Sequence, residues 1–248
     1  MSLMSILFII FFYLAVSLCV VGVTLKVIQY ASTPAPLKIP TAPAPLTKFG
    51  VFLRMTREVF LFSSLFRASK WTWLFGWIFH WALVLLFIRH LPYFWPGETP
   101  ELLRQAEPLK YAAFPLLFGL FGLLGRRFFV DRVRYISSPS DYLLLLLLIA
   151  IALTGVLMTF AHYYPDMGKV YAFAEGLLTL NWSELPSEGV FLLHIFMVFF
   201  LIAIFPISKM LHAPGVFFSP TLNQTDDARK KRHISDWAID KEKNSDGG

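Results

Sequence analysis

Five long apolar stretches constrain this chain more than any other feature. They cover Leu3–Leu25, Trp71–Phe94, Leu109–Gly125, Tyr142–Tyr164 and Gly189–Leu211. A helix needs about 20 apolar residues to cross about 30 Å of hydrocarbon. The third stretch is the shortest, and Pro115 and its glycines lower its helix propensity. Both residue types are nevertheless common in membrane helices. The sequence therefore predicts an all-α integral membrane protein, a bundle of five transmembrane helices.

The composition excludes several other classes of protein. Only 15% of the residues are charged and 56% are hydrophobic, whereas a soluble domain carries about 25% charged residues. The single cysteine, Cys19, excludes an internal disulfide, a cysteine-based zinc site and a self-contained iron–sulfur cluster.

The basic residues predict the orientation of the bundle. Most of the 22 lysines and arginines lie between the first two spans, between the third and fourth, and from Lys209 onward, while acidic residues gather in the other connections. By the positive-inside rule, the N-terminus lies outside and the C-terminus lies in the cytoplasm. The net charge of +6 is then explained by basic residues in the cytoplasmic connections, and we expect no nucleic-acid partner. The first span lacks a basic leader and is too long for a signal peptide, so we expect it to be retained.

The connections have features of their own. Residues 33–45 are proline-rich and predict an extended strap, and Val51–Lys70 predicts an amphipathic interfacial helix; together they form a cytoplasmic segment, 33–70. Val170–Leu180 predicts a short outer helix. We expect residues 1–212 to form the membrane domain and residues 213–248 a cytoplasmic tail.

The histidines carry the predicted chemistry. Four of the six lie in or at the ends of the second and fifth spans: His80, His90, His194 and His212. Ionisable residues within membrane spans are functional candidates. Because the two spans run in opposite directions, His80 and His212 share the cytoplasmic side, and His90 and His194 share the outer side. Two such pairs predict two b-type haems, each held by two imidazoles on its iron.

The spacing fits this prediction only in part. The 18 residues from His194 to His212 return to one helix face about 27 Å along the axis, whereas the 10 residues from His80 to His90 rise about 15 Å and turn about 80° off that face. The mismatch of about 12 Å requires helix tilt or a bend at Pro206.

Other interpretations of the histidines remain open. An intramembrane histidine can simply hydrogen-bond neighbouring helices. A zinc site is disfavoured because His-Glu-x-x-His and clustered carboxylates are absent from the sequence. We expect His162 at the outer mouth of the fourth span, as an interfacial residue, a spare ligand or a proton-transfer group. We expect His233 in the tail, solvated or at a protein interface.

Several motifs also carry a family resemblance. They are Thr33-Pro-Ala-Pro-Leu-Lys-Ile-Pro-Thr-Ala-Pro43, Phe75-Gly-Trp-Ile-Phe-His80, Leu86-Phe-Ile-Arg-His90 and His212-Ala-Pro-Gly-Val-Phe-Phe-Ser-Pro-Thr221. Over residues 1–218 the chain resembles the respiratory nitrate reductase gamma-subunit family of five-span dihaem cytochromes b. Within that family it is most similar to the DsrM-type cytochrome b subunit of the membrane complex linked to dissimilatory sulfite reductase. The resemblance implies the same pairing, His80 with His212 and His90 with His194.

The resemblance also implies a quinone pocket beside the outer haem. Lys110 matches a lysine that family members place there, and it could hydrogen-bond a quinone carbonyl. Alternatively, Lys110 merely reaches the membrane surface. Arg89 is a candidate partner for a haem propionate, or an ordinary anchor of the span end. Glu107 and His162 are weaker candidates for proton exchange.

The resulting prediction is an electron-transfer subunit of a quinone-linked oxidoreductase complex in a bacterial or archaeal cytoplasmic membrane. Electrons would pass between menaquinone or ubiquinone and a cytoplasmic iron–sulfur subunit resembling the catalytic subunit of heterodisulfide reductase, in a sulfur-metabolism complex with further membrane and periplasmic redox subunits. The tail, with Arg229–Arg232 and Trp237, would dock the cytoplasmic partner. The alternatives are the gamma subunit of a nitrate reductase and, from another class, a haem-free membrane anchor or transporter subunit.

Overall fold

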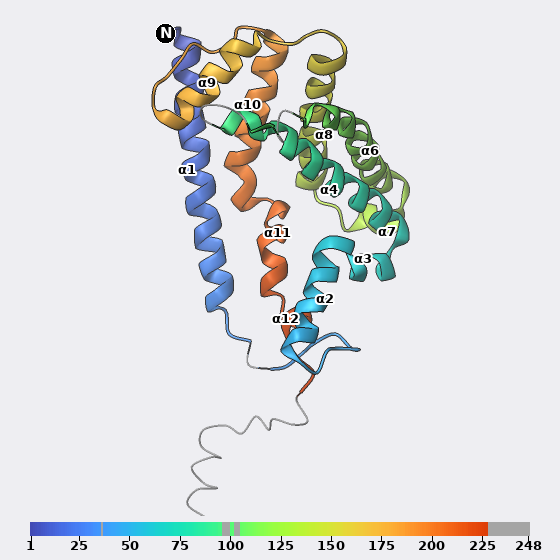
Figure 1. Ribbon diagram of the computed structural model, residues 1–248. Helices are drawn as coiled ribbons and strands as arrows, with labels where there is room; N and C mark the ends of the chain where they lie inside the picture. Colours follow the sequence, from blue (N-terminus) through green and yellow to red (C-terminus); the bar gives the residue numbers. More distant parts are fainter. Residues whose placement is uncertain (36, 96–99, 102–104, 228–248) are drawn as a thin grey trace, which may run out of the picture. The chain divides into compact units, whose positions relative to one another are not determined.

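The computed structural model describes residues 1–35, 37–95, 100–101 and 105–227, and every regular element within these ranges is a helix (Figure 1). The helices are α1 Leu3–Ser32, α2 Lys48–Leu61, α3 Ser63–Ala68, α4 Lys70–His90, η1 Leu91–Phe94, η2 Glu107–Ala112, α6 Ala113–Phe129, α7 Asp131–Tyr135, α8 Pro139–Phe160, α9 Met167–Thr179, α10 Gly189–Ile204, η3 Phe205–Ile207, η4 Lys209–Leu211, α11 His212–Gly215, η5 Val216–Phe218 and α12 Pro220–Asn223.

Five helical segments in the described part of the chain are long and apolar enough to cross a membrane. They are Leu3–Ser32, Lys70–Phe94, Glu107–Phe129, Pro139–Phe160 and Gly189–Ile207. This confirms the prediction of an all-α protein with five spans. The weakest predicted span is a full one, because Pro115 lies in the first turn of α6, where proline does not interrupt the helix.

The chain forms two compact units. The first comprises Met1–Lys26 and Phe62–Leu211, and therefore contains most of every span. The second comprises Val27–Leu61 and the chain from His212 onward. We describe each unit by itself.

In the first unit, α4, α6 and α8 pack side by side around one apolar core (Figure 1). Leu120 of α6 is fully buried there, between Ala82 of α4 and Ile149 of α8. A Cβ atom at Gly119 would lie 2.7 Å from the carbonyl oxygen of Phe75. Glycine at this position therefore permits the close approach of α4 and α6.

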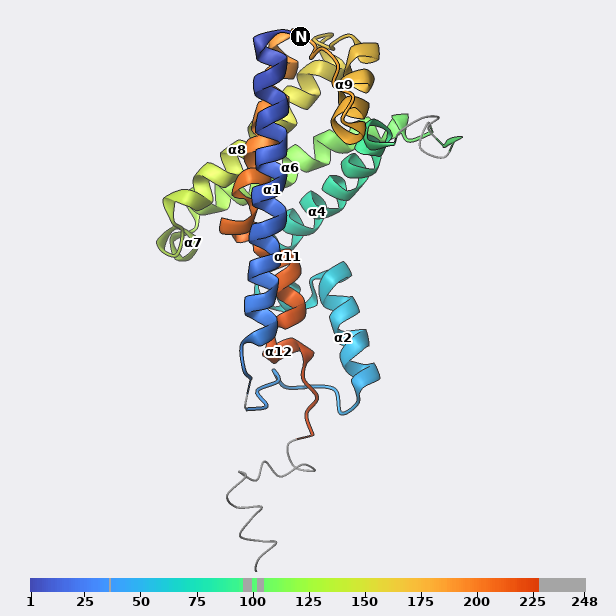
Figure 2. The same ribbon diagram turned by 90° about the vertical axis from the view of Figure 1, so that its left-hand side faces the viewer.

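A second core joins α1, α9 and α10. Phe8 of α1, Phe173 of α9 and Phe199 of α10 are buried in it. Figure 2 shows α9 beside the N-terminal part of α1. The short helix expected over Val170–Leu180 is thus present as α9. The carboxylate of Asp166 caps its start by accepting a hydrogen bond from the amide of Gly168 (3.0 Å).

The fifth span is present over Gly189–Ile207, and it is interrupted near its end, at the proline where the sequence allowed a bend. The α-helix ends at Ile204, a 3₁₀ turn follows, and Ser208 is extended, with φ −96° and ψ 169°. Pro206 causes the interruption, because its ring removes an amide donor and crowds the preceding turn. Helical rise and rotation therefore cannot be counted continuously from His194 to His212.

The predicted amphipathic helix over Val51–Lys70 is also interrupted. It consists of α2 and α3, with Phe62 between them in the left-handed region at φ 49° and ψ 47°. A bulky residue seldom adopts this conformation, so sequence periodicity alone could not indicate the break.

In the second unit, the described part of the proline-rich strap forms no helix, and it pairs with the segment that includes and follows α12. The amide of Thr41 donates to the carbonyl oxygen of Thr221 (2.9 Å), and the amide of Asp226 donates to that of Pro45 (2.9 Å). Lys38 adds an ion pair with Asp227. We call this pairing of residues 37–45 with residues 221–227 the clasp.

Candidate functional site

His194 is a half-buried residue of α10 whose ring faces α8. Its Nδ1 lies 2.8 Å from Oγ1 of Thr154, a buried residue of α8. A Cβ atom added at Gly155 would lie 3.7 Å from Cε1 of His194, which is ordinary van der Waals contact. The ring is therefore held by a hydrogen bond and by direct packing against the neighbouring helix.

His90 is the last residue of α4 and is exposed. Its Nδ1 donates to the carbonyl oxygen of Leu86, one turn earlier, at 2.7 Å. The ring of Tyr93 lies 5.9 Å from that of His90 and 5.0 Å from that of Tyr171 in α9. Tyr93 thus connects His90 with α9.

The structure brings His90 and His194 together, from two different helices. The two rings are near enough to interact electrostatically. These are the two residues that the sequence assigns to one site on the outer side.

His80 lies in the middle of α4 among aromatic rings. Its Nδ1 donates to the carbonyl oxygen of Gly76 at 2.6 Å. The rings of Phe62 and Phe79 lie 5.0 Å and 4.6 Å from it in edge-on geometry. His212 begins α11, in the second unit, and is exposed. The pairing of His80 with His212 stays a prediction.

The hydrogen bonds of these histidines test whether the donor set suits a haem iron. A carbonyl oxygen can only accept, so Nδ1 of His80 and of His90 must carry the proton. In the neutral ring the free lone pair is then on Nε2. A histidine whose Nδ1 makes a hydrogen bond binds a metal through this second nitrogen. Neutral imidazoles with an engaged Nδ1 are the ligands that a bis-histidine haem requires. The residues present fit that group.

Three other predicted residues lie near the start of the third span. Lys110 and Glu107 form an ion pair within η2. Arg89, the neighbour of His90, is near enough to Glu107 for an electrostatic interaction. Lys110 Nζ also lies 5.5 Å from the ring centre of Tyr111. A carboxylate, two cations and a phenol therefore lie near the same end as His90.

The remaining predicted residues lie apart from this group or outside the described structure. His162 follows the end of α8, is exposed, and has a left-handed backbone with φ 61°. His233, Arg229–Arg232 and Trp237 lie outside the described residues.

Thr154 and Asp141 were not predicted to be site residues from the sequence. The sequence does mark Thr154 as unusual, because it is a polar residue within an apolar helix. Nothing in the sequence indicates that its partner lies on another helix. Asp141 lies three residues after Ser138, and this spacing indicates a capping box at the start of α8. The amide of Ser138 does donate to Oδ2 of Asp141, at 2.9 Å.

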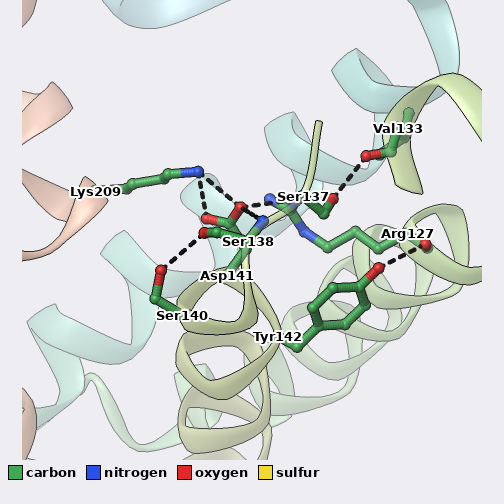
Figure 3. Close-up of polar contacts among 8 residues, drawn as sticks. All are labelled: Arg127, Val133, Ser137, Ser138, Ser140, Asp141, Tyr142 and Lys209. Carbon is green, nitrogen blue, oxygen red and sulfur yellow. Dashed lines mark hydrogen bonds and ion pairs between the residues drawn. The ribbon is translucent and has the colours of Figure 1, made fainter. Parts of the chain in front are cut away.

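Asp141 is also the centre of a buried polar network (Figure 3). Its side chain is 2% exposed, and Lys209 Nζ lies 2.6 Å from Oδ1 and 2.7 Å from Oδ2. Arg127 Nη1 lies 3.5 Å from Oδ2 and donates to Oγ of Ser137 at 2.6 Å. The network joins the end of α6, the start of α8 and the segment after the break in the fifth span.

Comparison with known proteins places the chain in a family. Residues 46–224 match the nitrate reductase gamma subunit family. The Hdr-like menaquinol oxidoreductase cytochrome b-like subunit of Archaeoglobus fulgidus is 33% identical, across 91% of this chain and 81% of the relative. Its counterpart in Archaeoglobus profundus is 32% identical, with 91% and 80% coverage. The respiratory nitrate reductase 2 gamma chain of Escherichia coli is 27% identical, over 57% of this chain and 72% of the relative.

The matched region contains four of the five apolar spans and all four span histidines, and the two archaeal relatives extend the similarity over most of the chain. With its five helices of membrane-spanning length, the chain is a multi-pass membrane protein, and it belongs to the nitrate reductase gamma subunit family.

Proposed function

We propose that this chain is a dihaem b subunit that transfers electrons between the membrane quinone pool and a cytoplasmic iron–sulfur partner. One observation carries the proposal: His90 of α4 and His194 of α10 lie near enough to each other to interact electrostatically. Each has its Nδ1 engaged, by Leu86 and by Thr154. This arrangement suits two axial ligands on one iron. His80 and His212 form the second pair, on the cytoplasmic side, by the topology inferred from sequence.

The relatives' names support the quinone side of the proposal. Two of them are menaquinol oxidoreductase subunits described as cytochrome b-like. When bound, haem supplies one-electron transfer, and a quinol supplies two electrons and two protons. The protein's own part is to ligate the iron, bury the porphyrin and place acid–base groups beside the quinone.

Lys110 and Glu107 are the residues that we assign to the quinone. The ammonium group of Lys110 has three donors, so it can hydrogen-bond a quinone carbonyl oxygen and retain Glu107. Glu107 is placed to exchange protons with the outer aqueous phase. Arg89, on the same end, is a candidate partner for a haem propionate.

The complex is the finer part of the proposal. The Hdr-like name of two relatives agrees with an expected cytoplasmic subunit that resembles the catalytic subunit of heterodisulfide reductase. From the sequence motifs and the distribution of basic residues, we further propose that the chain serves a sulfur-metabolism complex linked to sulfite reductase, in the cytoplasmic membrane, with its N-terminus outside. The second candidate is a nitrate reductase complex, favoured by the similarity to the Escherichia coli gamma chain.

Haem content measured on the purified complex tests this function. We expect a reduced absorption spectrum of low-spin b type and two haems per chain. His90→Ala and His194→Ala should each remove the same haem, and His80→Ala and His212→Ala the other. His233→Ala, in the tail, is the control and should retain both haems. Absence of haem from the intact wild-type complex would leave the anchor or transporter alternative, and loss of mismatched haems would refute the pairing. Subunits that co-purify distinguish the sulfur complex from the nitrate complex.

A further inference from the structure

We propose that Thr154 is a positioning residue for the outer haem. Its hydroxyl oxygen accepts the Nδ1–H of His194 and so fixes the ring with its Nε2 lone pair available to the iron. The inference rests on the proposed function, because it takes His194 as an axial ligand.

The hydrogen-bond geometry of Thr154 supports this role. Its Oγ1 lies 2.8 Å from Nδ1 of His194, 3.0 Å from the carbonyl oxygen of Ala150 and 2.9 Å from that of Ile151. Carbonyl oxygens only accept, and a hydroxyl group has a single proton. When that proton points at the two carbonyls, as threonine in a helix commonly arranges it, the oxygen is left to accept from His194.

Thr154 differs in kind from the groups that orient the other histidines. His90 and His80 donate to carbonyl oxygens of their own helix, one turn earlier, so the backbone supplies their acceptors. The side-chain partner of His194 is Thr154, on another helix, and the carbonyl oxygen of Ile151 in that helix also lies within reach of the ring. Thr154 is therefore the replaceable part of the surroundings that orient His194.

Burial makes this hydrogen bond consequential. Thr154 is 7% exposed, so no bulk water replaces it as an acceptor. An acceptor on the distal nitrogen makes a metal-bound imidazole a stronger donor to the metal, and losing such a partner typically costs about 10-fold to 100-fold in metal affinity. A stronger donor favours ferric over ferrous iron, so removal of the acceptor should raise the potential of the outer haem.

The test is a redox titration of the purified complex with Thr154→Val, which preserves the shape of the side chain without the acceptor. If the loss favours the ferrous form about tenfold, the potential of the outer haem rises by about 59 mV for this one-electron couple. The inner haem should not change. The ferric electron paramagnetic resonance signal of the outer haem should shift as well, because ring orientation and ligand strength determine it. The outer haem is identified by its absence in His90→Ala.

Two further variants make the experiment decisive. Thr154→Ser retains the hydroxyl and should keep the wild-type potential and signal. Thr159→Val is the matched control on the exposed side of the same helix and should change neither haem. A serine variant that shifts as the valine variant does would overturn the proposal, because the methyl group rather than the hydroxyl would then be responsible.

The remaining outcomes are also assigned. If Thr154→Val loses the outer haem altogether, retention of a normal haem in Thr154→Ser supports the proposal, and its loss there overturns it. An unchanged potential and signal in Thr154→Val overturn the role of Thr154 alone, provided that His194→Ala still removes the outer haem. If His194→Ala retains both haems, the proposed function itself fails.

Discussion

At the residue scale, the role that we propose for Lys110 requires one side chain to bind two partners. Its ion pair with Glu107 lies within a single turn of η2, so the lysine is held at the start of the third span by a residue of its own helix. Its side chain is 25% exposed and that of Glu107 is 59% exposed. The pair is thus open to water on the carboxylate side, which suits an exchange of protons.

We expect Lys110→Met to slow quinol-dependent haem reduction by about 100-fold, the typical cost of losing one donor to a developing negative charge. Both haems should remain bound. The matched control is Lys169→Met, which removes an exposed lysine of α9. Its haems should be reduced by quinol at the wild-type rate. Stopped-flow absorbance with a soluble quinol measures both rates, and equal rates in the two variants would remove Lys110 from the quinone site.

Glu184 provides a residue with a definite pH dependence. Hydrogen bonds from Ser2, and one from Ser5, hold the pKa of its carboxyl group below the ordinary value of 4.5. The amide of Ser2 donates to Oε1 at 2.9 Å. Because the folded pKa is the lower one, the attachment is at full strength above pH 4.5 and weakens as the pH falls toward the folded pKa.

We therefore expect hydrogen exchange at residues 2–6 to accelerate below about pH 4.5, after correction for the intrinsic pH dependence. Glu184→Gln should show faster exchange at neutral pH and no further change on acidification. Equal acid sensitivity in the two proteins would mean that another group controls the start of α1.

At the element scale, the Asp141 network holds three helix ends together. Lys209 follows the broken fifth span, and its side chain is 63% exposed, whereas that of Asp141 is 2% exposed. Removing the buried carboxylate deprives both cations of their counter-ion, while removing the lysine leaves the carboxylate with Arg127 and Ser138. Loss of Asp141 should therefore cost more stability than loss of Lys209.

We expect Asp141→Ala to destabilise the protein by about 2 kcal/mol, since it removes several hydrogen bonds to a charged group. Lys209→Met should cost only about 1 kcal/mol. Arg134→Met is the control, because its pair with Asp131 is exposed on both sides and should contribute less than about 0.5 kcal/mol. Thermal unfolding in detergent measures all three, and a cost for Lys209→Met above that for Asp141→Ala would contradict this account.

Elements were predictable from the sequence where one physical signal dominated. Apolar length was enough for the five spans, and proline content was enough to predict that the described part of the strap forms no helix. The break after Ile204 was not predictable from the sequence, because a proline such as Pro206 permits either a bend or an interruption of the helix. Only the extended backbone of Ser208 shows that the helix is interrupted. The left-handed Phe62 likewise depends on tertiary packing that no local pattern encodes.

The candidate site follows the same division. Carbonyl oxygens one turn earlier bind His80 and His90, and helix geometry alone makes such contacts available. Thr154 was missed because its contact with His194 crosses between helices separated by 40 positions in the sequence.

At the scale of the whole molecule, the clasp brings the strap and the start of the C-terminal segment together. Ile39 donates its amide to Oε1 of Gln224 at 2.8 Å, and Lys38 pairs with Asp227. The basic residues Arg229–Arg232 follow directly in the sequence. The tail that we expect to dock a partner therefore starts from a fixed point.

We expect a chain ending after residue 227 to retain both haems and the clasp but to lose its cytoplasmic partner on purification. Replacement of Arg229–Arg232 by glutamines should weaken the association in the same direction if charge attracts the partner. Affinity purification with subunit quantification measures this. Full recovery of the partner with the shortened chain would assign docking to another surface.

The interruption of the fifth span has a consequence for how the chain tolerates insertions. Within α10, one added residue would rotate every later side chain by about 100° and move it about 1.5 Å, so the packing of the helix would be lost. At the extended Ser208 the same addition lengthens a joint, while Lys209 stays tethered to Asp141. We therefore expect an added residue at Ser208 to be tolerated better than one within α10.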